Sequence, residues 1–196
     1  MRYDAEHKQK TRDRVLTEAA KAIRAEGPHR MGVAGVMARA GLTHGGFYAH
    51  FASKDDLVAA TIDRMFAEMR DRLHGGAEVG PREALQGYVG YYLSRTHRDS
   101  RTAGCPLPFL MADAPRLERA ARERFAQGVV SLTSTLSGHL SALGWADADC
   151  AASSMLAEMV GALSMARAEP DPERSDRILE HSRQALRRRY DLETDA

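Results

Sequence analysis

Apolar residues along this chain recur at intervals of three and four, the spacing that places them on one face of an α-helix. The strongest series occupies residues 58–73, with Val58, Ile62, Met65, Phe66, Met69 and Leu73 as its apolar positions. A second long series runs from Phe125 to Leu143. No stretch alternates β-branched and polar residues as a half-buried strand does. The pattern therefore predicts an all-α fold.

Caps and helix breakers divide this pattern into nine predicted helices. In chain order they cover about residues 8–25, 33–40, 43–49, 53–73, 85–92, 104–113, 125–143, 148–168 and 175–190. Gly41 stands where a left-handed backbone usually ends a helix, and Thr43 and Ser53 are suitable N-caps for the helices that follow. The stretches 74–81 and 169–176 are loops by composition.

The stretch AGLTHGGFYAHF, residues 40–51, places two glycines inside a short predicted helix. Two short helices joined by a tight glycine-containing turn, after a longer first helix, form a helix-turn-helix. Its second helix enters the DNA major groove, so Gly45 and Gly46 keep the outward face low, at a cost of roughly 1 kcal/mol each. Phe47 and Phe51 are expected to brace the segment from the core side.

The segment ARAGLTHGGFYAHFASKDDLVAATI also resembles the helix-turn-helix signature of the TetR (tetracycline-repressor) family of transcriptional regulators. Twelve positions match the family pattern: Ala40, Gly41, Leu42, Thr43, Gly45, Phe47, Tyr48, His50, Phe51, Ser53, Lys54 and Leu57. The resemblance is strong over residues 8–66. Beyond them it rests on length, helix count and the patch GCPLPFLMADAP.

The resemblance implies a nine-helix fold with a DNA-binding domain at residues 1–54 and an effector-binding and dimerisation domain at residues 55–196. The implied DNA-binding residues are Thr43, Tyr48, His50 and Lys54 on phosphates, with His44 and Gly45 facing bases. The basic arm Lys8, Lys10 and Arg12 is expected to bind DNA as well. The family usually has Thr or Ser at the start of the second helix, where this chain has Met31 and Gly32. Because this side-chain cap and phosphate contact are missing, DNA binding is expected to depend more on backbone N–H groups and on the basic arm.

Charge is segregated along the chain in a way that agrees with this division. Residues 1–54 contain ten Lys/Arg and five Asp/Glu, whereas residues 55–196 contain eighteen and twenty-two. Such polarity suits a small module that binds a polyanion, carried by a larger body that does not. A chance fluctuation of composition is the alternative.

Tyrosines and methionines of the larger domain offer apolar walls with polar tips, which suits a small organic effector. The predicted ligand-binding residues are Met65, Met69, Tyr88, Tyr92, Cys105, Phe109, Trp145 and Met159. Each of them alone is more often part of an ordinary helical core. The family resemblance also suggests a cavity in this domain.

Cys105 raises a second interpretation, an electrophile- or redox-sensing regulator. It precedes Pro106 at a predicted helix start, where unpaired N–H groups favour a thiolate, and Arg98 and Arg101 are near in sequence. A small residue at a crowded helix entry is the alternative. The other cysteine, Cys150, is expected to be packed and inert, and two cysteines without metal-ligand spacing predict no metal site. No cofactor is predicted.

Small residues on the eighth predicted helix permit close approach of another helix. They are Ala151, Ala152, Ser153, Ser154, Ala157, Gly161 and Ala162, and the ninth helix adds Ile178, Leu179, Ala185 and Leu186. The expected partner is a second copy of the chain, because TetR-like proteins dimerise through these two helices and one helix-turn-helix reads too few base pairs. Packing within the chain is the alternative.

Other function classes find little support. No HExxH, GxSxG, P-loop or paired-carboxylate pattern organises the histidines and carboxylates into an enzyme site. No apolar stretch reaches membrane-spanning length and no signal peptide begins the chain, so a cytoplasmic protein is expected. The sequence predicts a DNA-binding regulator, by analogy a repressor, released from a palindromic operator by a small organic effector. A helical binding module whose DNA-binding head has lost competence remains an alternative.

Overall fold

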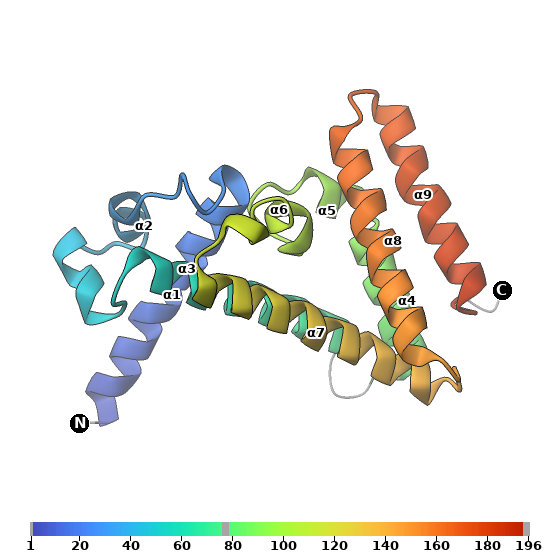
Figure 1. The fold of residues 1–196 in the computed structure, drawn as a ribbon, viewed down its shortest axis with the longest axis horizontal. Helices are drawn as coiled ribbons and strands as arrows, with labels where there is room; N and C mark the ends of the chain where they lie inside the picture. The colour runs from blue at the N-terminus through green and yellow to red at the C-terminus, as the bar shows by residue number, and fades with distance from the viewer. Residues whose placement is uncertain (1, 76–78, 194–196) are drawn as a thin grey trace. The chain divides into compact units, whose positions relative to one another are not determined.

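The structure, a computed structural model, describes residues 2–75 and 79–193. These residues contain helices and no strand, which confirms the all-α prediction (Figure 1). The α-helices are α1 (Arg2–Glu26), α2 (Val33–Arg39), α3 (Lys54–His74), α4 (Pro81–Tyr92), α5 (Arg95–Asp99), α6 (Leu107–Leu110), α7 (Arg119–Ala142), α8 (Ala148–Ala168) and α9 (Pro172–Arg189). Two 3₁₀ helices, η1 (His44–Ala49) and η2 (Ala114–Arg116), complete the described elements.

Most of the expected helices occur, with three informative differences. The helix expected over 43–49 is the 3₁₀ helix η1. The short helix α5 was not expected, since its sequence RTHRD has no apolar periodicity. The helix α1 begins at Arg2, well before the expected residue 8, and the ion pair between Lys10 and Glu6, four residues apart, supports this polar first part.

The chain forms two compact units. Unit 1 consists of residues 1–66 and 101–128, and unit 2 consists of residues 67–100 and 129–196. Helices α3 and α7 each contribute to both units. These units do not coincide with the predicted DNA-binding and effector-binding domains, whose boundary at residue 54 stays a prediction.

The helix-turn-helix of unit 1 is held by a small apolar core. Val15 of α1, Val36 and Met37 of α2, and Phe47 of η1 are all buried. The rings of Phe47 and Phe51 stack with their centres 5.7 Å apart, which confirms that these two residues brace the segment.

The turn after α2 follows the expected glycine geometry. Gly41 has a φ of +70°, in the left-handed region where residues with a side chain are strained. The Leu42 amide donates to the Met37 carbonyl at 2.9 Å, which closes the end of α2. This tight closure fixes where η1 begins.

The segment 101–116 of unit 1 is attached to the C-terminal end of α1 by a buried arginine. The Arg24 Nε donates to the Gly104 carbonyl at 3.0 Å, and the side chain is 7% exposed. Further along unit 1, the Phe66 ring of α3 packs edge-on against Phe125 of α7, 5.6 Å between centres. Gly128 makes room for this packing, because a Cβ there would lie 2.2 Å from the Phe66 ring.

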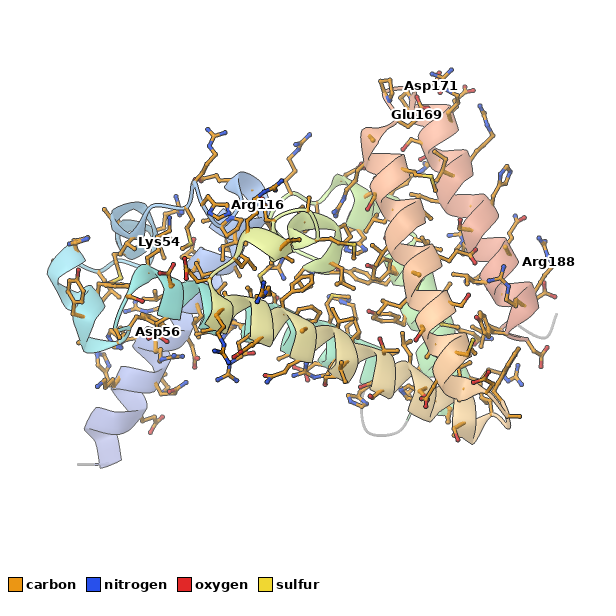
Figure 2. The ribbon with its side chains drawn as sticks, in the orientation of Figure 1. Lys54, Asp56, Arg116, Glu169, Asp171 and Arg188 are labelled. Atoms are coloured by element: carbon orange, nitrogen blue, oxygen red, sulfur yellow. The ribbon has the colours of Figure 1, made fainter. Side chains whose placement is uncertain are left out.

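Unit 2 contains the helical hairpin of α8 and α9, which run side by side (Figure 1). Glu169 and Asp171 lie at the turn between them (Figure 2). The Asp171 carboxylate caps α9 by accepting from the Arg174 amide at 2.8 Å. The Ser175 hydroxyl donates to the Ala166 carbonyl at 2.6 Å, so the turn is bonded from both sides.

Helix α5 is held in unit 2 by polar contacts, which explains why periodicity failed to reveal it. Ser94 caps its start by accepting from the His97 amide at 3.1 Å. The Arg167 guanidinium of α8 donates to the His97 carbonyl at 2.8 Å. Arg98 forms an ion pair with Asp176 of α9 at 2.6 Å.

Candidate nucleic-acid interface

Helix η1 has a solvent-exposed face, and Tyr48 is the large side chain on it. Its ring is 70% exposed and meets the buried Phe47 edge-on, 5.2 Å between centres. His44, at the first position of η1, is also exposed. Thr43 is the residue before η1, but its side chain makes no capping hydrogen bond, so the expectation that it caps the helix is wrong. A 3₁₀ turn needs no such bond here because the Gly46 amide donates to the Thr43 carbonyl.

The two adjacent glycines of η1 have different surroundings. A Cβ added at Gly45 would meet no atom within 4 Å, and Gly45 has no positive φ. At Gly46 a Cβ would contact Met37 and Thr43, each at 3.9 Å. Gly45 is exposed whereas Gly46 is half-buried. Neither the fold nor the backbone conformation of this chain therefore requires a glycine at position 45.

Three of the expected phosphate-binding residues lie close together where α1 passes η1. The Arg12 guanidinium stands over the Phe51 ring, 4.6 Å from its centre. Burial first, and then the positive charges of Lys8 and Arg12, lower the pKa of the His50 imidazole. The Nδ1 atom of His50 is buried and has no hydrogen-bond partner among the described residues. The resulting cluster is basic and includes a histidine that is easily deprotonated.

Lys54 is the first residue of α3, two residues before Asp56 (Figure 2). Its Nζ donates to the His29 carbonyl at 2.8 Å, a contact that the sequence did not predict. Ser53 caps α3 as expected, because its hydroxyl accepts from the Asp56 amide at 3.1 Å. Lys54 is thus tied to the loop after α1 and retains two further N–H donors.

Two basic residues near this surface were missed in the sequence. Arg14 of α1 and Arg39 of α2 line a hollow of about 620 Å³ together with Lys10 and Gly41. Arg14 is four residues from Lys10 on the same helical face, which is the signal that could have identified it. The hollow also contains Glu18, 3.9 Å from Arg39, so its charge is mixed.

The two residues that depart from the family pattern, Met31 and Gly32, have clear structural places. Met31 is 1% exposed and belongs to the core of unit 1. Gly32 is the N-cap of α2 and provides no side-chain hydrogen bond. The first turn of α2 therefore keeps its backbone N–H groups without a side-chain cap, as the sequence indicated.

The residues predicted to bind an effector are distributed over both units. Those that are 2% exposed or less are Met65 and Cys105 in unit 1, and Met69, Tyr88, Tyr92 and Met159 in unit 2. The rings of Tyr88 and Tyr92 lie 5.7 Å apart. Phe109 and Trp145 are half-buried, and Trp145 packs on Tyr190 at 5.0 Å. An effector cavity lined by these residues stays a prediction.

Cys105 is in a poor position for thiol chemistry with molecules in solution. Its side chain is completely buried, and α6, which begins two residues later, has only four residues and so only a small dipole. Arg98, expected to favour a thiolate, is paired with Asp99 and Asp176 in unit 2. Cys150, expected to be packed, is exposed instead, because it lies on the outward face of α8.

The residues expected at a dimer interface differ in exposure, and four of them are half-buried: Ala151, Gly161, Ile178 and Ala185. Ala152, Ala162, Leu179 and Leu186 are buried within one chain, in which α8 packs on α9 and both helices contact α4. Ser153, Ser154 and Ala157 are exposed on the other face of α8, in line with Met165, whose side chain is 57% exposed. Within residues 2–75 and 79–193 no helix is long and apolar enough to cross a membrane, and no cluster of three or more potential metal ligands occurs.

Comparison with known proteins agrees with this geometry. Residues 15–61 match the sequence model of the bacterial regulatory proteins of the tetR family. Escherichia coli NemR in its reduced form is 22% identical and superposes with a TM-score of 0.79 over 91% of this chain and 97% of that one. A TetR transcriptional regulator from Chloroflexus aurantiacus is 25% identical, with a TM-score of 0.75 over 92% and 94% of the two chains. A TetR-family regulator from Agrobacterium tumefaciens is 24% identical, with a TM-score of 0.75 over 92% and 98%. A search of curated proteins by sequence gave no match.

Proposed function

We propose, from the premise that this chain is a transcriptional regulator of the TetR family, that it binds a palindromic DNA operator as a homodimer and is released by a small organic effector. The DNA-binding domain would be residues 1–54 and the effector-binding and dimerisation domain residues 55–196. Repression of transcription is the proposed outcome of operator binding.

The observation that carries the proposal is the exposed face of η1. A side chain 70% exposed, Tyr48, stands beside a glycine, Gly45, that neither packing nor backbone conformation requires. A major groove that receives this face explains both features, since the phenol reaches a phosphate while the bare backbone approaches the bases. His44, exposed at the first turn, is then placed to reach a base edge.

The basic cluster supplies the part of the affinity that does not depend on base sequence. Lys8, Arg12 and His50 come from two elements and meet at one side of η1. Lys54, at the start of α3, adds a further cation, which the His29 carbonyl holds by a hydrogen bond. Each phosphate contact releases counterions, so binding should weaken steeply as salt rises.

Two arguments support a dimer: the number of base pairs that one helix-turn-helix can contact, and the exposed surface of α8. One helix-turn-helix contacts a single half-site, whereas a two-fold dimer reads two half-sites about one helical turn apart. Ser153, Ser154 and Ala157 are exposed on one face of α8, and their small side chains let another helix approach closely, with Met165 available as an apolar contact.

A small organic effector is favoured over thiol oxidation as the releasing signal. The buried aromatic pair Tyr88 and Tyr92 and the methionines Met69 and Met159 give the body adaptable apolar volume with polar tips. Effector binding would shift the population of conformations toward one with unsuitable half-site spacing. Sensing through Cys105 would first require that completely buried side chain to become accessible.

Selection of bound sequences from a random duplex library, with purified full chain, tests the proposal. A palindromic winner bound far more tightly than scrambled DNA supports it, and no enrichment at any salt concentration contradicts it. The variant Lys8→Ala should reduce the slope of log affinity against log salt by about 0.9 per contact, or about 1.8 for a dimer. The variant His44→Ala should instead relax the preference at one position in each half-site and leave the slope unchanged.

A further inference from the structure

A pair of histidines in unit 2 takes no part in the proposed DNA interface or effector site. His74 is the last residue of α3 and His139 lies near the end of α7. Their ring centres are 6.1 Å apart, with the ring planes inclined by 59°. Both side chains line an open hollow of about 430 Å³, together with Gly138 and three residues that carry hydroxyl groups: Ser131, Ser134 and Thr135.

Nothing else in the described part of the chain uses these two imidazoles. Neither ring has a hydrogen bond or an ion pair with another described side chain, and no carboxylate lines the hollow. His97, by contrast, is buried and shares a 2.8 Å hydrogen bond with the Tyr92 carbonyl. His50 is flanked by Lys8 and Arg12, whose charges would repel a cation.

The separation of the two rings is compatible with a shared metal ion. With a metal–nitrogen distance of about 2.0–2.1 Å and a ring centre about 1.1 Å behind each nitrogen, two ligating rings can be at most about 6.4 Å apart. Two rings on opposite sides of an ion reach this limit, whereas two rings at a tetrahedral angle stand about 5.2 Å apart. The observed 6.1 Å lies between these values, so the rings must approach by about 1 Å to share a tetrahedral ion. His74 is exposed and His139 is half-buried, so both rings can turn toward a common ion without disturbing the core.

We propose that His74 and His139 form a binding site for one divalent transition-metal ion of the nickel, copper and zinc group. Two imidazole nitrogens suit these borderline ions, whereas magnesium and calcium prefer oxygen ligands. Water and the hydroxyl oxygens of the hollow complete the coordination. Because only two protein nitrogens take part, the site is a micromolar one and differs from a closed four-ligand structural zinc site.

Bound metal at this position would join the C-terminal end of α3 to α7. An ion that binds the folded chain and not the unfolded chain raises the unfolding temperature, by an amount that grows with metal concentration. This gives a readout that is independent of any operator or effector. The metal site can therefore be disproved without affecting the proposed function, and the proposed function can be disproved without affecting the metal site.

The test is a calorimetric titration of the full chain with Zn²⁺ in a buffer that does not chelate metal. The exposed thiol is removed beforehand by Cys150→Ala, since a thiolate is itself a zinc ligand. The expected result is one ion per chain with micromolar affinity. The variants His74→Ala and His139→Ala should each weaken binding at least about tenfold, since each removes half of the protein ligands.

A matched control separates this site from adventitious binding. His181 is an exposed histidine of α9 and does not line the hollow, so His181→Ala should bind Zn²⁺ as the parent does. Thermal unfolding with and without Zn²⁺ should show a rise in the parent and in His181→Ala only, and circular dichroism without metal shows that each variant is folded. Equal Zn²⁺ binding by all variants, or no binding by the parent at about 100 μM, would overturn the proposal.

Discussion

Replacing Gly45 by alanine should have opposite effects on stability and on DNA binding. A Cβ at this position meets nothing within 4 Å and the backbone has no positive φ, so the methyl group fits the free chain. Alanine loses less conformational entropy on folding and is expected to stabilise the chain by roughly 0.5–1 kcal/mol. For a chain of 196 residues this raises the unfolding temperature by about 1–4 °C.

The same methyl group should obstruct the operator. It projects into the space that the major groove would occupy, and an extra methyl in a close-packed contact costs about 1–3 kcal/mol. A dimer carries the change twice, so the loss of operator affinity should be at least roughly 30-fold. Fluorescence anisotropy with the selected operator measures the affinity, and thermal unfolding followed by circular dichroism measures the stability.

Gly46→Ala is the matched control for this substitution. Its Cβ would meet Met37 and Thr43 at 3.9 Å, an ordinary contact on the inner side of η1. It should leave operator affinity within about twofold of the parent while remaining folded. If Gly45→Ala binds the operator as tightly as the parent does, the glycine is not there to admit DNA, and the reasoning about the exposed face of η1 is wrong.

Three further outcomes are expected. Gly128→Ala should destabilise the chain by about 1–3 kcal/mol in denaturant unfolding, because its Cβ would lie 2.2 Å from the buried Phe66 ring; unchanged stability would contradict this packing. Burial and two cations of α1 lower the pKa of His50, and a bound phosphate would raise it, so operator binding takes up a proton. Affinity should therefore fall as pH rises from the lowered pKa of His50 in the free chain toward its higher pKa in the complex, by at most tenfold per pH unit and half-site, and the same pH profile in His50→Gln would refute this. Exposed Cys150 should react with a thiol reagent much faster than buried Cys105, and rapid reaction of the Cys150→Ala chain would reopen the thiol-sensing alternative.

Features that depend on local rules were predictable from the sequence. The left-handed backbone at Gly41 and the cap at Ser53 follow from residue chemistry alone, and both occur as expected. The buried positions of α3 follow from its apolar spacing. Burial of Phe47 and Phe51 follows from the need to support a segment that contains two glycines.

Features that depend on distant contacts were not predictable. Helix α5 exists because Arg167, about seventy residues further along the chain, donates to its C-terminal carbonyl groups, and no local pattern encodes this contact. Trp145 packs on Tyr190 just after the end of α9, a contact that the sequence did not predict, and its place at an effector stays a prediction. Lys54 was expected only at a phosphate, but its contact with the His29 carbonyl depends on how the loop after α1 folds back.

The adjacent residues Gly45 and Gly46 have the same explanation in the sequence but different surroundings in the structure. In the sequence both are helix-averse residues with the same explanation, a low face for DNA. In the structure Gly46 faces Met37 and Thr43 across ordinary contact distances, whereas Gly45 faces open space. A glycine that costs stability and that its own chain does not need is best explained by a molecule outside the chain. The exposed tyrosine beside it and the basic cluster of α1 are the reasons why we propose that this molecule is a polyanion with a groove.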